Sequence, residues 1–547
     1  MTSSSSFSTH VVTNQPPPLL PFDAWQTDQA LRDAVAREAP GADAEPLAEY
    51  GARVGSELSE WGFLANRFRP QLHTHDRWGN RRDQVEFHPA YHQLMQAAME
   101  AGVHSLGWTG GRGAQVLRAA LSYLHHQAEA GTSCPLTMTF AAVPVLRKGG
   151  AELAPWLSRA LARSYDPRDV PGPAKSAVTL GMGMTEKQGG SDVRANTTHA
   201  LALGAGRYEL VGHKWFFSAP MSDAFLVLAQ AEGGLSCFLV PRHRSDGGRN
   251  ALRLLRLKDK LGNWANASAE VEFEAAEAWR IGEEGRGVAT LLEMVGLTRL
   301  DCMLGSAAEM RRALIEAVHH ARNRRAFGKR LLDQPLMREV LADLALEVEA
   351  AVALAFRVAG ALDRGAQDAA EAALLRIGTA LGKFWVCKRA PAVVNEAQEC
   401  LGGAGYVEES ILPRLYREAP LNGIWEGCGN IQCLDVLRAI RREPRTLDAL
   451  AAELTRAEGL DPAFDAELAD LRARLARLQA AEAVPEREAR RLAQQLAQCL
   501  QGAILLRHRP RLGAAFCASR LGAGRGRVFG GAHLQDVEEE LLDRVGF

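Results

Sequence analysis

The chain has 547 residues, 47% hydrophobic and 24% charged, and its 65 acidic and 64 basic side chains nearly cancel. This composition excludes a largely disordered chain, a collagen-like chain and a coiled-coil rod. Because the net charge is only −1, no overall field attracts nucleic acid or an anionic membrane, so any such role needs a local patch. At ~100–200 residues per domain, the length predicts three or four domains.

Several features bear on the compartment. The first basic residue is Arg32 and no apolar run precedes it, so we expect no secretory signal. No apolar run approaches the ~18–20 residues that span a bilayer, so no membrane association is expected. The nine cysteines are scattered without a C-x-x-C pair, which predicts reduced thiols in the cytoplasm. The histidine pairs at 125/126 and 319/320 lack partners at metal-ligand spacing, so no metal site is expected.

The first third of the chain is predicted to be helical after an extended arm. Residues 1–20 are rich in Ser and Thr and then in Pro, which is typical of an extended segment. From about 22 to 165 the chain is rich in Ala, Leu, Glu and Arg and has few strand signals. We therefore assign 1–180 to an N-terminal arm and a helical domain.

The middle of the chain changes character at about residue 180. Short β-rich runs, at 208–211, 225–229 and 237–240, are separated by glycine-containing turns. This pattern predicts an antiparallel β domain over 181–282.

Helical periodicity then returns. It is sustained over 300–321, 336–362 and 370–400, which predicts a helical bundle over 283–443. Beyond it, 444–547 is predicted to be an extra helical domain, because leucines fall on one face at 468, 471, 475 and 478 and again at 492, 496 and 500. The predicted fold class is α+β, mainly α: helical domain, β domain, helical bundle, and an extra C-terminal helical domain.

Three segments have compositions that differ from those of segments that only pack in the core. Met184–Asp192 (MTEKQGGSD) combines hydroxyls with small residues, which let a flat or phosphorylated ligand approach the backbone; an ordinary polar turn is the alternative. Gly212–Ser218 (GHKWFFS) places three aromatics beside a hydroxyl and could form a wall for a planar ring, or a buried strand. The pair Gly181/Gly183 does not complete a dinucleotide G-x-G-x-x-G motif.

The third segment is Ile424–Gln432 (IWEGCGNIQ), which leads into an apolar-periodic helix. Glycines and Asn before a helix expose N–H groups at its positive end. Glu426, beside Trp425, is placed to be a desolvated carboxylate that acts as a base. A carboxylate that caps the helix is the alternative.

In this order and spacing, the three segments resemble the acyl-CoA dehydrogenase family of flavoproteins, over roughly 150–440. Thr185-Glu186 and Gly190-Ser191-Asp192 match the flavin-binding T-E-P-x-x-G-S-D, with Lys187 in place of Pro. Gly212-x-Lys214 and Phe216-Phe217-Ser218 match G-x-K-x-W-I-T/S, with Phe216 where Trp usually lies against the flavin.

Two further elements extend the resemblance. Arg324-x-x-Phe327-Gly328 matches R-x-x-F-G, which in the family reaches the adenosine diphosphate of FAD in a neighbouring subunit. Leu401-Gly402-Gly403-x-Gly405 matches a glycine-rich turn with the same purpose, with Glu399 in place of the customary Gln. The resemblance thus implies FAD as cofactor, bound by Met182, Met184, Thr185, Gly190, Ser191, Phe216, Phe217, Ser218, Arg324, Phe327, Gly402, Gly403, Trp425, Gly427 and Asn430.

The resemblance also implies the catalytic residue. Glu426 falls on the family's catalytic glutamate, which removes an α-proton from an acyl thioester while the flavin accepts the β-hydride. Some relatives carry that glutamate on an earlier helix just before an Arg; here that place is Thr298, before Arg299. The base is therefore assigned to Glu426.

Ordinary members of the family end near what is here 440, whereas this chain continues for about a hundred residues. That extension, the Lys187 and Phe216 departures and Thr13-Asn14-Gln15-Pro16 resemble the alkylation-response branch of the family. This resemblance implies an FAD-containing homotetramer, a dimer of dimers, that binds double-stranded DNA through its C-terminal domain, limits alkylation damage and has weak acyl-CoA dehydrogenase activity of the isovaleryl-CoA kind.

The charge pattern offers separate support for DNA binding. Between Glu488 and Asp536 there is no acid but there are eight arginines, which can neutralise phosphates. With arginines at the end of the preceding helix, the expected DNA contacts are Arg438, Arg441, Arg507, Arg509, Arg511, Arg520, Arg525 and Arg527. Alternatives are a solvated face, or a basic surface paired with the acidic tail at 536–540. The competing function is a metabolic acyl-CoA dehydrogenase whose extra domain serves assembly only.

Overall fold

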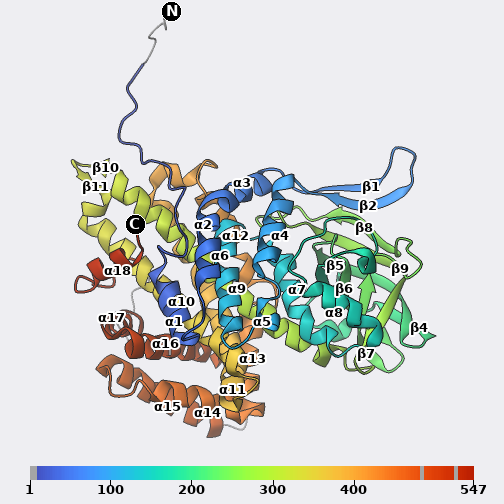
Figure 1. Ribbon diagram of the computed structural model, residues 1–547. Helices are drawn as coiled ribbons and strands as arrows, with labels where there is room; N and C mark the ends of the chain where they lie inside the picture. Colours follow the sequence, from blue (N-terminus) through green and yellow to red (C-terminus); the bar gives the residue numbers. More distant parts are fainter. Residues whose placement is uncertain (1–8, 481–485, 523–527) are drawn as a thin grey trace, which may run out of the picture.

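The structure, a computed structural model, describes residues 9–480, 486–522 and 528–547 (Figure 1). An extended arm leads into a helical region, a β domain, a bundle of long helices and a final group of shorter helices. In Figure 1 the β domain lies on one side of the bundle, and the final helices α14–α17 lie along its lower end. This arrangement confirms the predicted fold class.

The N-terminal region is helical, as expected, except for one hairpin. Its helices are α1 (Gln29–Glu38), α2 (Glu45–Arg53), α3 (Ser59–Arg67), α4 (Pro89–Ala101), α5 (Leu106–Thr109), α6 (Ala114–Ala128), α7 (Ser133–Leu146) and α8 (Ala154–Ala160). Strands β1 (Gln71–His75) and β2 (Arg81–Glu86) pair and project from the molecule (Figure 1). The sequence missed them because both strands are largely exposed and polar, so they lack the apolar alternation of a half-buried strand.

The β domain is a closed sheet. Its strands are β3 (Leu180–Gly183), β4 (His199–Gly204), β5 (Arg207–Ser218), β6 (Ala224–Ala231), β7 (Gly234–Pro241), β8 (Leu252–Leu257) and β9 (Ser268–Ile281). Neighbours run β3-β6-β4-β5-β9-β7, β8 pairs with β9, and β7 pairs back with β6. Most pairs are antiparallel, as expected, but β3 and the first residue of β4 run parallel to β6.

Strand β6 shows why this region reads as a run of apolar residues. Leu226 and Leu228 face a cluster shared with α7 and the start of the bundle, whereas Phe225 and Val227 face the interior of the sheet. Because side chains alternate along a strand, a strand covered on both faces must be apolar throughout.

The bundle is built on α9 (Gly287–Asn323), α10 (Pro335–Arg364) and α11 (Ala369–Cys400), which pack on one another. A two-stranded hairpin, β10 (Arg325–Ala326) and β11 (Lys329–Arg330), joins α9 to α10. The helices α12 (Leu412–Glu418) and α13 (Gly429–Arg442) follow α11, and α13 packs against it.

The final helices are α14 (Pro444–Thr455), α15 (Pro462–Ala480), α16 (Ala489–His508), α17 (Pro510–Arg520) and α18 (Glu538–Arg544). Leu492, Leu496 and Leu500 are buried on one face of α16, as predicted, in the same apolar core as the bundle. Helix α16 contacts α10, α11 and α13, so this group is fused to the bundle by a continuous core. Within the described ranges, no helix has the length and apolarity to cross a membrane.

Candidate active site and the C-terminal arginines

The turn before α13 holds Glu426 in an unusual backbone conformation. Its φ is +58°, and Gly427 follows at +94°, a region that costs a residue with a side chain of order 1 kcal/mol or more. Lys383 Nζ donates to the carbonyls of Trp425 and Gly427, both at 2.7 Å. Arg299 Nε donates to the carbonyl of Glu426 at 2.9 Å. Side chains from two bundle helices therefore fix all three carbonyls of the turn.

The carboxyl group of Glu426 receives one hydrogen bond, from Thr298 Oγ1 to Oε2 at 2.8 Å. Burial raises its pKa; the Thr298 hydrogen bond and the charges of Lys383 and Arg299 oppose that rise but do not cancel it. A carboxyl group whose pKa is raised towards neutral pH is better suited to act as a general base there.

Thr298 stands at the position where the glutamate of some relatives was expected. The fold brings this position on α9 into hydrogen-bond contact with Glu426, although 128 residues separate them in the sequence. A threonine at this place can donate to the carboxylate, whereas a second glutamate would repel it. The contact is consistent with Glu426 as the single base.

Part of the flavin segment lies beside this turn. Met182, on β3, belongs to an apolar cluster against which Met184 and Trp425 also pack. Ser218, at the end of β5, belongs to the same neighbourhood, because both Ser218 and Glu426 influence the pKa of the Cys134 thiol. The structure thus brings the three expected segments together.

Neither the Thr185 nor the Ser191 hydroxyl donates to another group in the described residues, and the Phe216 ring is 51% exposed. Unused hydroxyl donors and an open aromatic ring are groups that can hold a flavin. The residues present therefore fit the implied FAD.

Phe217 was wrong as a cofactor contact. It is fully buried inside the β domain, with its ring centroid 4.2 Å from that of Phe225 and 6.1 Å from that of Phe273. Because β5 alternates its faces, Phe216 points outward and lies 4.7 Å from Lys258 Nζ. Only one of the two adjacent phenylalanines can face a ligand.

Two charged motif residues have a structural role that the sequence did not reveal. Glu186 and Lys214 form an ion pair at 2.8 Å in which neither side chain is exposed. Lys214 Nζ also donates to the carbonyl of Leu228, and Glu186 accepts from the backbone N–H of Thr198. The pair locks the loop after β3 onto β5. The sequence did contain a signal for this pair: each of the two motifs carries one charged residue that the expected ligand contacts do not use.

The remaining cofactor residues lie elsewhere. Phe327, in the β10–β11 hairpin, is 97% exposed with φ +52°, and Gly402, φ +59°, has open space around it. From Thr298 to Asn323 helix α9 runs for 25 residues, or about 38 Å at 1.5 Å per residue. Gly402 and Gly403 follow the end of α11, which runs on for 17 residues, or about 26 Å, from Lys383 beside the turn to Cys400. In a single chain, Arg324, Phe327, Gly402 and Gly403 are therefore not gathered around Glu426.

The N-terminal arm is hydrogen-bonded to the β10–β11 hairpin. Asn14 Nδ2 donates to the carbonyl of Arg325 at 2.9 Å, and Asn14 Oδ1 accepts from the N–H of Arg325 at 2.8 Å. Arg324 Nη1 donates to the carbonyl of Asn14 at 2.6 Å. Asn14 has φ +59°, a conformation that asparagine tolerates better than most residues. These contacts give Asn14, in the Thr13–Pro16 stretch noted in the sequence, a structural role: it holds the arm against the hairpin.

Asn430 lies at the start of α13, where its Oδ1 accepts from Arg490 Nη1 at 2.7 Å. Arg490 belongs to α16, and its guanidinium lies 5.6 Å from the centroid of the Phe384 ring. The C-terminal helices thus reach the edge of the candidate active site through a residue that was expected only to belong to a basic patch.

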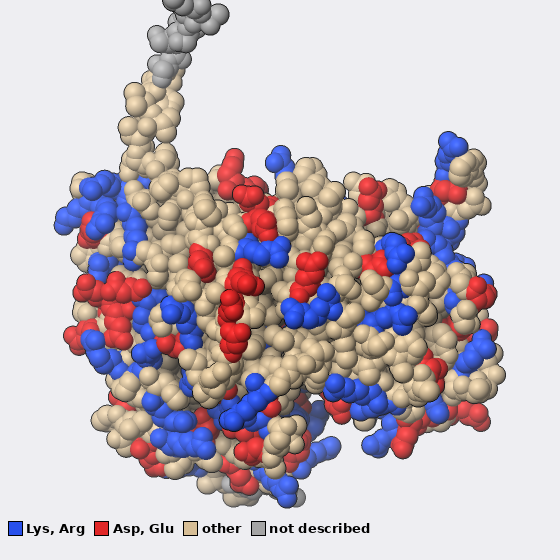
Figure 2. Space-filling model, in the orientation of Figure 1, with Lys and Arg blue, Asp and Glu red and all other residues tan. Residues whose placement is uncertain are grey.

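Most expected DNA-binding arginines are paired with acids from other parts of the fold. Arg507 pairs with Glu453, Arg509 with Asp33, and Arg511 with Glu540 of the acidic tail. In Figure 2 acidic and basic side chains are interspersed over the lower left, where α14–α17 lie. The acid-free window of the sequence is therefore not an acid-free surface.

Arg520 was wrong as a DNA contact. Its side chain is only 12% exposed and pairs with Asp343 and Glu347 of α10. It fastens α17 to the bundle. By contrast, Arg438 is 58% exposed although it pairs with Asp435 at 3.5 Å, and Arg441 is exposed with no ion pair among the described residues, so both are accessible. Arg525 and Arg527 lie outside the described residues.

Three family models match this chain. They are the adaptive response protein AidB N-terminal domain over 14–167, the acyl-CoA dehydrogenase middle domain over 181–276, and the acyl-CoA dehydrogenase C-terminal domain over 285–441.

Curated relatives agree. The chain is 53% identical to Escherichia coli AidB over 84% of this chain and 85% of that protein, and 34% identical to acyl-CoA dehydrogenase family member 11 of Caenorhabditis elegans over 81% and 74%. Among solved structures, C. elegans ACDH-11 in complex with C11-CoA matches with a TM-score of 0.86 and 28% identity, covering 99% of this chain and 95% of that one. This protein belongs to the acyl-CoA dehydrogenase family, in its AidB branch.

Proposed function

We propose that this protein is an FAD-containing acyl-CoA dehydrogenase of the alkylation-damage response, acting as a cytoplasmic homotetramer, with weak dehydrogenase activity and the ability to bind double-stranded DNA. The observation that carries the enzymatic part is the carboxyl of Glu426, which is buried and has a raised pKa. Thr298 holds this carboxyl, and Lys383 and Arg299 fix the turn that carries it.

In the proposed reaction, Glu426 removes the α-proton of an acyl thioester. The thioester carbonyl would accept a hydrogen bond from the backbone N–H of Glu426, which stabilises the charge that develops on oxygen as the proton leaves. Lys383, Arg299 and Thr298 keep the turn and the carboxyl in position. When bound, FAD would supply the acceptor for the hydride that leaves the β-carbon.

FAD would be held by the hydroxyls of Thr185 and Ser191, the backbone at Gly190, and the outward face of Phe216. Because Phe327 follows the far end of α9 and Gly402 follows the far end of α11, both lie far from Glu426 in the same chain, and their expected contact with the adenosine diphosphate requires a second copy. The 97% exposure of Phe327 supports this assembly, since an aromatic side chain so exposed is a natural interface residue. The acyl-CoA ligand in the matching C. elegans structure supports a thioester substrate.

DNA binding would rest on Arg438 and Arg441 at the end of α13 and on the exposed parts of Arg507, Arg509 and Arg511, with Arg525 and Arg527 as further candidates. Contacts would be made to phosphates, with little reading of base sequence. A second function is favoured by a specific observation: Arg507, Arg509 and Arg511 already have acidic partners. That would suit a metabolic dehydrogenase whose C-terminal helices serve assembly only.

One experiment separates the two functions. Binding of FAD-loaded protein to a duplex is measured across a salt series, beside the double variant Arg438→Ala/Arg441→Ala. A steep salt dependence that becomes shallower in the variant, while the flavin absorbance is unchanged, supports the DNA role. Duplex binding that is absent at low salt, together with flavin bleaching by acyl-CoA thioesters, would leave only the metabolic function.

A further inference from the structure

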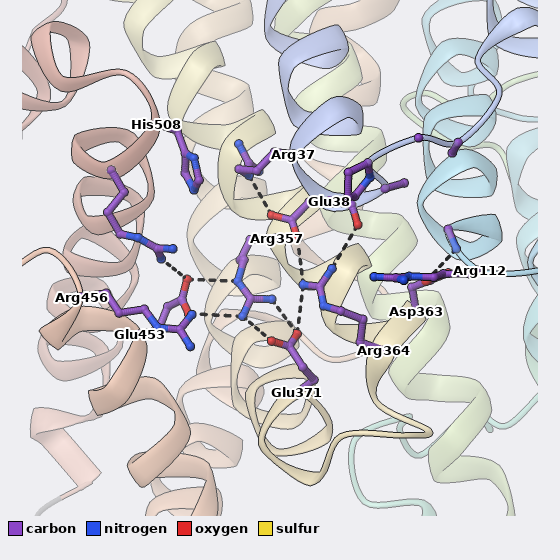
Figure 3. A pocket seen from close by; sticks show the side chains of 16 residues that line it. Arg37, Glu38, Arg112, Arg357, Asp363, Arg364, Glu371, Glu453, Arg456 and His508 are labelled. Atoms are coloured by element: carbon purple, nitrogen blue, oxygen red, sulfur yellow. Dashed lines mark hydrogen bonds and ion pairs between the residues drawn. The ribbon is translucent and has the colours of Figure 1, made fainter.

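A pocket of about 470 Å³ lies where three parts of the chain meet, away from Glu426 (Figure 3). Its walls come from the end of α1 and the loop after it, the facing ends of α10 and α11, and helices α14 and α16. This volume is within the ~300–1,000 Å³ typical of small-molecule sites. None of the expected flavin or thioester residues lines it.

The lining is unusually rich in arginine. Six arginines face four carboxylates: Arg37, Arg112, Arg357, Arg364, Arg456 and Arg507 against Glu38, Asp363, Glu371 and Glu453. With His508 neutral, the lining carries an excess of two positive charges. Burial and the neighbouring charges of Arg37 and Arg507 lower the pKa of His508, which keeps its ring neutral at pH 7.

The carboxylates are already shared among the arginines. Glu453 accepts from Arg357 at 3.1 Å, from Arg456 at 3.0 Å and from Arg507 at 2.9 Å. Glu371 binds both Arg357 and Arg364, and the latter also reaches Glu38 (Figure 3). Since a guanidinium has five N–H donors, this sharing leaves donors on several arginines unused.

Arg112 stands apart from this network. Within the described residues it has no ion pair, and in Figure 3 its side chain points into the pocket towards Arg364. The nearby Asp363 is engaged instead by the backbone N–H groups of Gly113 and Gln115, at 2.9 and 3.0 Å. Since Arg364 is already balanced by Glu38 and Glu371, the positive charge of Arg112 is the part of the lining that an incoming anion could neutralise.

We propose that this pocket binds a small phosphorylated molecule through its phosphate group, whose two negative charges match the excess of two positive charges in the lining. Arginine forks match phosphate oxygens in pairs, and a concave site with low-dielectric walls strengthens their attraction for an anion. Arg357 and Glu453 of the lining are buried whereas Arg112 is exposed, so the site is concave: a small molecule would fit into it, and the backbone of a duplex would meet only the rim.

The test uses full-length, FAD-loaded protein, so that the cofactor site is filled. Inorganic pyrophosphate is titrated by calorimetry at constant ionic strength, and we expect saturable binding with a Kd below about 1 mM. Arg112→Ala should weaken it about tenfold or more, as expected for the loss of a charge-assisted hydrogen bond. Because Arg112 neutralises no carboxylate, this variant should keep its thermal stability and its flavin.

The matched control is Arg194→Ala, which removes an exposed arginine of the β domain that has no ion pair in the described part of the chain. It should bind pyrophosphate as the parent does. The proposal is overturned if pyrophosphate gives no saturable heat, or if Arg112→Ala binds it equally well. It is also overturned if a short duplex displaces pyrophosphate and Arg112→Ala weakens duplex binding, because the site would then belong to DNA. None of these outcomes depends on flavin bleaching, so the enzymatic proposal is tested separately.

Discussion

The turn around Glu426 and the arginines of α16 and α17 are both charged regions, but their neighbours act in opposite ways. At Glu426, helices α9 and α11 supply a hydroxyl and two cations that fix the turn, and burial still leaves the carboxyl with a raised pKa. On α16 and α17, neighbouring elements supply carboxylates that neutralise the arginines. The carboxyl of Glu426 therefore remains able to act as a base, whereas carboxylates from other parts of the fold neutralise several arginines of the acid-free window.

The sharpest test of the first region is Glu426→Gln. Without a carboxylate to take the α-proton, flavin reduction by acyl-CoA thioesters should slow by about 10²–10⁴-fold, while bound FAD stays at the parent level. Stopped-flow absorbance of the flavin measures the rate. A variant that reduces flavin at the parent rate would remove Glu426 from the mechanism.

The second region is tested by Arg520→Ala. This change leaves buried Asp343 without its ion-pair partner, whereas Glu347 keeps Arg389 at 2.9 Å, so we expect a loss of about 3 kcal/mol of unfolding free energy. Arg511→Ala is the matched control: its side chain is 68% exposed, and the loss should stay below about 1 kcal/mol. Thermal or denaturant unfolding compares them. Equal losses in the two variants would contradict the structural role assigned to Arg520.

The pH dependence of the enzyme should respond to Thr298→Val. The base works when it is deprotonated, so activity rises as pH increases through the pKa of Glu426, which burial places above its ordinary value. Removal of the Thr298 hydroxyl takes away a hydrogen bond to the charged form, so this pKa rises further and the rising limb of kcat/KM moves to higher pH. Thr290→Val, on the same helix with its hydroxyl bound to the Arg286 carbonyl, should leave the limb in place.

A smaller effect is expected for Arg441→Ala in the salt dependence of DNA binding. If Arg441 contacts one phosphate, the slope of log K against log salt should become shallower by about 0.9. Arg520→Ala is unsuitable for this assay because of its stability loss, so Arg194→Ala provides the comparison. An unchanged slope would mean that the end of α13 does not touch DNA.

The smallest expected effect is that of Asn14→Ala, which removes two hydrogen bonds, each of about 0.5–1.5 kcal/mol, from an exposed site. The β10–β11 hairpin should then be cut severalfold faster by trypsin at the basic residues between Arg324 and Arg330. Gln15→Ala, next to it on the arm and exposed, is the control. Identical digestion of the two variants would show that Asn14 does not hold the hairpin.

The sequence alone determined the order of helical and β regions, the apolar faces of α15 and α16, and the segment that contains Glu426. These are local properties: periodicity follows from which face is buried, and a ligand-binding turn needs particular residues close together in the chain. It did not determine the β1–β2 hairpin, whose exposed strands carry no apolar pattern.

Which charges face each other follows from the three-dimensional packing of the chain. Thr298 meets Glu426 across 128 residues, Glu186 meets Lys214 inside the β domain, and Arg520 meets Asp343 across 177. The same packing places the Phe217 side chain in the core and leaves the Phe216 side chain exposed. Electrostatic partners are set by distances in space, which a linear pattern of charges does not contain.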